Sequence, residues 1–188
     1  RRATFFGGKG LIQSIALARA GACVYHAGCI GEDGTAMRDY LRENGVNTDY
    51  IFITEGPSGH TVIQVDEHAQ NCILLWGGAN RRQRREQIDR VLSDFGAGDF
   101  LLLQNEINEI PYLMEQAHRR GMRIALNPSP IDEELMRFPL EKADYLLLNE
   151  IEGNAFTGET QPEEILRRLS ESYPGMKILL TLGGDGCL

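Results

Sequence analysis

The sequence of 188 residues lacks several features that would point to a membrane, a disulfide or a metal-binding protein. No stretch approaches the ~20 apolar residues that a helix needs to cross a bilayer. The four cysteines show no CxxC spacing, which favours small buried side chains in a reducing compartment over a disulfide framework or a zinc site. The four histidines also lack metal-ligand spacing, so we expect structural or surface roles for them.

Basic side chains are outnumbered, with 19 Lys and Arg against 27 Asp and Glu and a formal net charge of -8. An acidic surface repels phosphate backbones and anionic lipid, so we expect neither nucleic acid nor a membrane as a partner. An anionic metabolite remains open, because a few amides and one lysine can outweigh the net charge locally. No leader of charged and then apolar residues opens the chain, and we expect a cytoplasmic protein.

Two common nucleotide-binding patterns are missing as well. The stretch GGKG (7–10) is not a Walker A loop, because Ala3 stands where the first glycine is required and Gly10 where Ser or Thr is required. It is not GxGxxG either, since Gln13 occupies the third glycine position. A Rossmann-type dinucleotide binder is therefore disfavoured.

What the sequence does contain is an alternation of amphipathic helices and short apolar strands. Nearly continuous apolar strands between such helices predict a parallel sheet covered on both faces, in a three-layer α/β sandwich. The predicted helices cover 10–21, 35–45, 81–95, 109–121, a short stretch from Glu150, and 162–175. The predicted strands cover 22–31, 49–54, 60–67, 71–76, 99–104, 122–127, 143–149 and 176–184.

Three of these strands, at 49–54, 60–67 and 71–76, follow one another with no helix between them. They predict a small sheet or flap attached to the main body. Ser58, in the GPSGH turn of this region, is not expected to be a nucleophile, because it does not lie on a strand-to-helix elbow.

Ligands of parallel sheets bind at the carboxyl ends of the strands, which directs attention to the loops there. NEIE (149–152) has a plain interpretation, with Asn149 as helix N-cap and the two glutamates favoured by the helix dipole. Alternatively, a carboxylate there could hold a magnesium–phosphate complex through water. TLGGDG (181–186) and GGKG are either ordinary turns or places where backbone approaches a ligand closely.

GAGD (96–99) resembles a phosphate-cradling motif that carries a carboxylate base. Such a motif must open a helix, so that free amides and the helix dipole converge on the anion. Here it follows a predicted helix and leads into a strand. We therefore expect Asp99 to be a turn residue at the amino end of that strand, and not a base.

Placed in order, the motifs resemble the ribokinase-like (PfkB) carbohydrate kinases. The resemblance covers GGKGLIQSIALARAGA, CIGEDG, RENGVNTDYI, GGAN, LLLQNEI, ALNPSP, LLLNEIEGNAFTG and LLTLGGDGCL, and so runs over essentially the whole chain. It implies an ATP-dependent kinase that transfers the γ-phosphoryl group to a hydroxymethyl group of a ribose-like sugar or a nucleoside. It also implies one ribokinase-like domain over 1–188, in which 49–75 contributes strands to a β lid.

The resemblance assigns roles to individual residues. Those expected at the sugar are Gly8, Lys9, Gly10, Ile12 and Glu106. Those expected at ATP are Asn149, Thr181, Gly183 and Gly186, with Glu152 acting on Mg2+ through water. A monovalent cation such as K+ and a homodimer through the lid remain open on this resemblance.

Two departures from the family pattern affect the prediction. Ile12 stands where ribokinase-type members usually carry Asn. An isoleucine cannot hydrogen-bond a sugar hydroxyl, and the loss of a buried polar contact costs about 1–3 kcal/mol. The resemblance therefore supports ribose itself less strongly as the substrate. The family's first strand and its C-terminal GAGD segment are also absent, so we expect the catalytic base beyond Leu188 and a catalytically incomplete chain. The alternative is a PfkB-fold protein that binds a metabolite or nucleotide without turnover.

Overall fold

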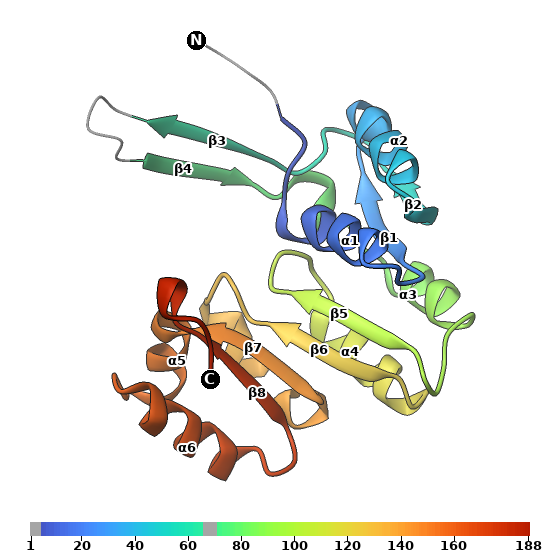
Figure 1. Cartoon of the computed structure of the whole chain (residues 1–188). Coiled ribbons are helices and arrows are strands. Elements are labelled where there is room, and N and C mark those ends of the chain that lie inside the picture. Colours follow the sequence, from blue (N-terminus) through green and yellow to red (C-terminus); the bar gives the residue numbers. More distant parts are fainter. Residues whose placement is uncertain (1–4, 66–70) are drawn as a thin grey trace. The chain divides into compact units, whose positions relative to one another are not determined.

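A computed structural model describes residues 5–65 and 71–188. The chain divides into two compact units, residues 1–84 and residues 85–188 (Figure 1). Each unit has its own cluster of buried apolar side chains. The end of the strand predicted at 60–67 lies outside the described residues.

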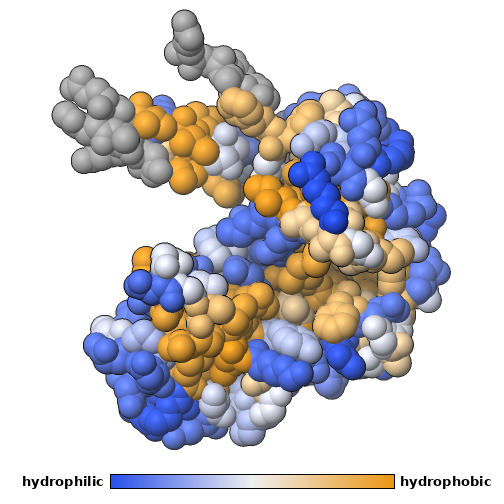
Figure 2. Space-filling model, viewed as in Figure 1, coloured by the Kyte–Doolittle hydropathy of each residue, from blue (hydrophilic) through white to orange (hydrophobic). Residues whose placement is uncertain are grey.

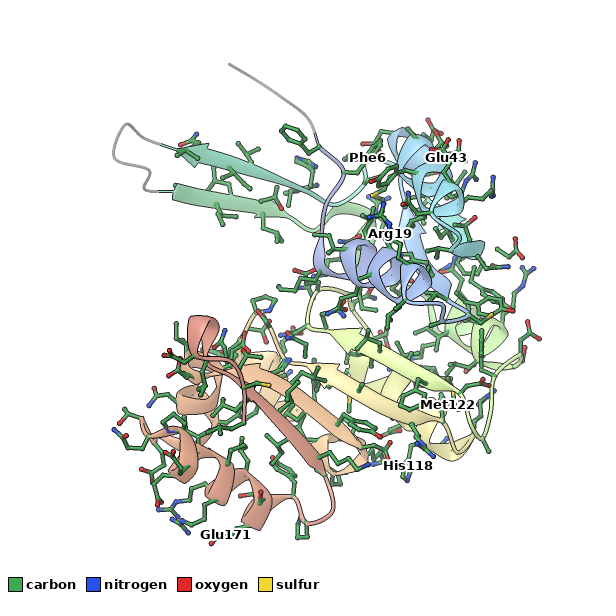
Figure 3. All side chains as sticks on the ribbon, viewed as in Figure 1. Phe6, Arg19, Glu43, His118, Met122 and Glu171 are labelled. Atoms are coloured by element: carbon green, nitrogen blue, oxygen red, sulfur yellow. The ribbon has the colours of Figure 1, made fainter. Side chains whose placement is uncertain are left out.

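The first unit begins with two helices that pack against a pair of strands. These elements are α1 (Lys9–Arg19), β1 (Tyr25–Ile30), the short 3-10 turn η1 (Glu32–Gly34), α2 (Thr35–Glu43) and β2 (Asn47–Ile53). Leu11 and Ile15 of α1 are buried together with Leu41 of α2 and Val46. Phe6, labelled in Figure 3, precedes α1, and its ring centroid lies 5.4 Å from that of Tyr40 on α2.

The strand predicted at 49–54 does not join the two strands that follow it. β2 pairs in parallel with β1, while β3 (His60–Val65) and β4 (Asn71–Trp76) form a separate antiparallel hairpin, followed by the turn η2 (Gly78–Arg81). The prediction of one three-stranded flap is therefore wrong for β2. The reason is that α2 supplies the crossover that a parallel pair requires, and it returns the chain beside β1.

Burial in the first unit also differs from the prediction. The sequence predicts strands covered on both faces, including the one at 22–31, yet only Cys29 and Ile30 of β1 are buried and Tyr25 is 44% exposed. Cys29 is likewise the only one of the four cysteines that is buried; Cys23, Cys72 and Cys187 are exposed. Buried positions for all four cysteines were a wrong expectation, because an apolar neighbourhood in sequence does not fix the face of an element.

The second unit is a four-stranded parallel sheet in the order β5-β6-β7-β8, with helices in its connections. Its helix α3 begins at Arg85, so most of the basic run at 81–86 lies in η2 and the loop after it, and not in a helix. The elements are α3 (Arg85–Leu92), β5 (Phe100–Gln104), α4 (Ile110–Arg119), β6 (Arg123–Asn127), η3 (Glu133–Arg137), η4 (Leu140–Lys142), β7 (Tyr145–Asn149), α5 (Glu150–Thr157), α6 (Pro162–Ser172), β8 (Lys177–Thr181) and η5 (Gly183–Asp185).

One face of this sheet forms the core of the second unit. The inward side chains of alternate strand positions are buried against the helices, among them Leu103, Ile124, Leu126, Leu146, Leu148 and Leu180. The opposite face carries Leu102, Ala125, Leu147 and Leu179, which are half-buried or exposed. Figure 2 shows apolar side chains on the surface over β7 and β8. The predicted α/β class with a mostly parallel sheet is confirmed, and within the second unit the helices pack on the face that carries the core.

None of the helices in the described part of the chain combines the length and the apolar character that crossing a bilayer requires.

A partly buried hydrogen bond joins α1 to β1. Ser14 Oγ lies 2.8 Å from His26 Nδ1, Ser14 is buried and His26 is half-buried. Burial lowers the pKa of His26, because an imidazolium would lose solvation there. The unfolded chain therefore takes up a proton at a higher pH than the folded chain does. This histidine costs no stability above its unfolded pKa, and destabilises the fold progressively as the pH falls below it.

Replacing His26 by Gln tests this linkage, since Gln keeps a hydrogen-bonding partner for Ser14 but does not titrate. Between about pH 7.5 and about pH 5.5, we expect the melting temperature of the wild type to fall by about 2–4 °C more than that of His26→Gln. The exposed His118, in the last turn of α4 (Figure 3), provides the matched control His118→Gln. Equal slopes for wild type and His26→Gln would contradict the assignment.

Candidate active site

Each strand of the four-stranded sheet ends in a polar residue. The last residues of β5, β6, β7 and β8 are Gln104, Asn127, Asn149 and Thr181. Gln104 is paired in register with Asn127, and Asn149 with Thr181. The parallel sheet therefore gathers polar side chains at its carboxyl edge, which is where such sheets bind ligands.

The NEIE stretch forms a complete capping box at the end of β7. Asn149 Oδ1 accepts a hydrogen bond from the Glu152 amide, and Glu152 Oε2 accepts one from the Asn149 amide, both at 2.9 Å. The predicted N-cap role of Asn149 is confirmed. Glu152 is only 8% exposed, so a carboxylate lies partly desolvated in the first turn of α5, where the helix dipole favours negative charge.

The TLGGDG stretch forms a tight turn directly after β8. The Thr181 hydroxyl donates to the Leu148 carbonyl at 3.3 Å, and the Leu182 amide donates to the Gly186 carbonyl at 2.8 Å. Gly183 and Gly186 have φ values of 58° and 94°, a region that favours glycine. A Cβ on either glycine would meet no other atom within 4 Å, so the space beside this loop is open to a ligand.

Glu106 lies just beyond the end of β5 and is half-buried. The preceding residue, Asn105, is 1% exposed and was not singled out from the sequence. Its amide donates to Ser129 O at 3.2 Å, and its side-chain Nδ2 donates to Pro130 O at 2.7 Å. Asn105 thus fastens the loop after β5 to the NPSP loop after β6. A buried asparagine between two strand-end loops leaves no periodic signal in the sequence, which is why it was missed.

The GGKG stretch begins α1 in the first unit, as predicted. Gly8 is the N-cap with a φ of 102°, and the helix starts at Lys9. A Cβ on Gly7 or Gly8 would again meet nothing within 4 Å. Ile12, in the first turn of α1, is 60% exposed, so its apolar side chain faces open space and offers no hydrogen bond to a ligand.

The GAGD stretch has the geometry of an ordinary turn. It lies between α3 and β5, and the Asp99 carboxylate accepts a hydrogen bond from the Gly96 amide at 2.9 Å. The Asp99 amide in turn donates to Gly96 O at 3.0 Å. Asp99 directly precedes the amino end of β5, opposite the edge that carries the polar strand ends. The prediction that this motif opens no helix is confirmed.

Acidic and thiol side chains do not gather into a direct metal site in the described part of the chain, where no three His, Cys, Asp or Glu residues come together as ligands. His26 and His60 make the contacts of structural residues, with Ser14 and with the Ser58 carbonyl respectively. His68 lies outside the described residues. Ser58 donates its hydroxyl to Asp33 at 2.8 Å, which agrees with its dismissal as a nucleophile.

The parallel sheet with a glycine-rich turn at its carboxyl edge defines an α/β protein with a strand-end ligand site. Comparison with known proteins gives the family, because the pattern of the pfkB family carbohydrate kinases matches residues 2–188. The chain therefore belongs to the pfkB family of carbohydrate kinases.

Its relatives include ribokinases. The ribokinase of Bacillus subtilis is 33% identical over 187 residues, covering 96% of this chain and 61% of that protein. The ribokinase of Haemophilus influenzae is 30% identical, covering 96% and 62%. A structure of Arabidopsis thaliana ribokinase with ribose and ATP has a TM-score of 0.80 at 26% identity, covering 96% and 62%. The chain spans about 62% of the length of these relatives.

Proposed function

We propose that the full-length protein transfers the γ-phosphoryl group of ATP to a hydroxymethyl group of a ribose-like sugar or a nucleoside. The observation that carries the proposal is the paired ends of β7 and β8. There the capping box of Asn149 and Glu152 lies beside Thr181 and a glycine turn with open space around it. A partly desolvated carboxylate next to exposed backbone suits a nucleotide that carries magnesium.

In this proposal the nucleotide is bound along the turn after β8. Thr181, Gly183 and Gly186 border it, since glycine lets a ligand approach the backbone closely. Asn149 orients Glu152 through the capping box, and the Glu152 carboxylate would hold Mg2+ through water. The metal would neutralise charge on the phosphates, which, together with positioning, is most of what phosphoryl transfer requires. Asp99 has no role in this scheme.

GGKG and Glu106 are the segments proposed to contact the sugar. Gly8 and Gly10 would bring backbone amides at the start of α1 to the sugar, Lys9 adds a positive charge, and Glu106 would accept hydrogen bonds from hydroxyls. The β3–β4 hairpin would serve as the lid that excludes water from the reaction. Ribose is the reference substrate, because ribose is the sugar named in the complex of the Arabidopsis relative.

Three further parts of the proposal concern the surroundings of the reaction. A homodimer through the hairpin is supported by its exposed apolar side chains, which include Val62, Ile63, Ile73, Leu74, Leu75 and Trp76 (Figure 2). A monovalent cation such as K+ is an optional activator. The use of ATP as phosphoryl donor fits a cytoplasmic protein.

A substrate panel with the full-length protein tests the proposal. With Mg2+ and ATP we expect ADP release that depends on a pentose, a hexose or a nucleoside, and Glu106→Gln should raise KM for that substrate about tenfold. Glu133→Gln, an exposed glutamate in η3, is the matched control and should behave as wild type. No ADP release with any acceptor would end the kinase proposal, and an unaffected Glu106→Gln would remove Glu106 from the sugar site.

Ile12 favours a second candidate, a protein that binds metabolite or nucleotide without turnover. It is 60% exposed at the start of α1, where a hydrogen-bonding side chain would serve a sugar better. The two candidates differ in one result. Tight binding of ATP and sugar with no phosphorylated product would favour the second candidate.

A further inference from the structure

Three turns of the first unit meet at the base of the β3–β4 hairpin. They are Gly31–Gly34 after β1, Gly56–Gly59 before β3 and Gly77–Asn80 after β4, and together they are called the hairpin joint below. Ser58 lies at its centre and is only 9% exposed. Its position between the end of β1 and both strands of the hairpin suggests a mechanical role.

Two side chains hold the first two turns together. Asp33 Oδ1 accepts hydrogen bonds from both the amide and the hydroxyl of Ser58, each at 2.8 Å. Ser58 Oγ in turn accepts a hydrogen bond from the Gly31 amide at 2.9 Å. The hydroxyl is thus used as donor and as acceptor, and both partners belong to the turn after β1.

The third turn is tied to the second through the backbone. The Ala79 amide donates to Pro57 O at 3.1 Å, and Ala79 is fully buried. Close packing leaves no room for side chains at two of the glycines. A Cβ on Gly31 would lie 2.1 Å from Gly56 O, and one on Gly59 would lie 2.6 Å from Asn80 Nδ2. The joint therefore has one close-packed arrangement that small shifts would break.

We propose that Ser58 and Asp33 are positioning residues that fix the direction of the β3–β4 hairpin relative to the end of β1. All described side chains of β3 are exposed, so the hairpin gains little support from packing along its length. Its orientation then depends on the joint, and a lid must return to one position to exclude water at each turnover. This inference rests on the proposed function for the link to catalysis, and on geometry alone for the anchoring of the hairpin.

Hydrogen exchange in the full-length protein tests the anchoring. Ser58→Ala and Asp33→Ala leave the Ala79–Pro57 bond chemically intact, so the Ala79 amide reports on the joint as a whole. We expect its protection to fall about tenfold in either variant, while the amides of the four-stranded sheet keep theirs. Asp33→Asn keeps an acceptor oxygen, so the Ala79 amide should lose less protection in this variant than in Asp33→Ala. Glu32→Ala, an exposed carboxylate in the same turn, is the control and should match wild type.

Kinetics with the substrate found by the panel tests the link to catalysis. We expect Ser58→Ala and Asp33→Ala each to raise KM for the sugar about fivefold, with kcat changed less than about twofold. Because the two residues act as one unit, the KM of the double variant should be close to that of either single variant. Unchanged Ala79 protection, or a loss of protection spread evenly over the four-stranded sheet, would overturn the anchoring, and an unchanged KM would overturn its link to catalysis. If no acceptor is phosphorylated, the proposed function fails, and the exchange pattern still decides whether the pair anchors the hairpin.

Discussion

Glu152→Gln is expected to lower kcat about 100-fold while leaving the fold nearly as stable as wild type. Gln still accepts the hydrogen bond from the Asn149 amide, since a capping box works with either Glu or Gln. Only the charge is lost, which at a helix N-terminus costs stability by about 0.3–1 kcal/mol. The variant therefore separates the structural role of this side chain from its proposed role at magnesium and phosphate. Steady-state kinetics and thermal melting of the full-length protein measure the two effects.

Glu150→Gln is the matched control for this prediction. Glu150 occupies the first turn of the same helix and is exposed. Loss of the Glu150 charge should lower the free energy of unfolding by a similar amount through the helix dipole, and should leave kcat within about twofold of wild type. If Glu152→Gln turned over as fast as Glu150→Gln, Glu152 would be a helix cap only.

Asn105→Ala has the second largest expected effect, a loss of about 1–3 kcal/mol in the free energy of unfolding. The side chain is 1% exposed, and its removal leaves the Pro130 carbonyl without the donor that lies 2.7 Å away. The loops after β5 and β6 would then be less firmly held, so KM for the sugar should rise through the neighbouring Glu106. Denaturant unfolding measures the first effect, and initial rates over a range of sugar concentrations measure the second.

Asn154→Ala provides the comparison for Asn105. Asn154 Nδ2 donates to Glu159 O at 3.0 Å in the same kind of bond, but on the surface. Water replaces the donor there, so the expected loss stays below about 0.5 kcal/mol. Equal losses for the two variants would show that burial of Asn105 does not matter to the strand-end loops.

Local sequence signals predicted the elements of the second unit well. Apolar runs such as LLLQ and YLLLN predicted the strands of the parallel sheet, and Asn149 followed by Glu152 predicted the start of α5. The GAGD turn was assigned correctly because its neighbours in sequence, a helix before and a strand after, decide its geometry. These features depend on residues close together in the chain, which is why periodicity and spacing reveal them.

Features that depend on distant residues were missed. The pairing of β2 with β1 depends on where the chain returns after α2. The apolar run at 49–54 predicts a strand but does not indicate its partner. Asn105 and the pair of Ser58 with Asp33 owe their roles to partners 25 residues away in each case. Which face of the four-stranded sheet carries the core of the second unit likewise depends on what packs there, because both faces carry leucines.

The central claim is phosphoryl transfer from ATP to a sugar hydroxymethyl group, and identification of the product tests it most directly. The full-length protein is incubated with Mg2+, ATP and the acceptor from the panel, and the products are analysed by phosphorus NMR and mass spectrometry. We predict equal amounts of ADP and of a sugar or nucleoside monophosphate esterified at its hydroxymethyl oxygen. Release of ADP with inorganic phosphate and no phosphorylated acceptor, or bound ATP that stays intact, would contradict the account.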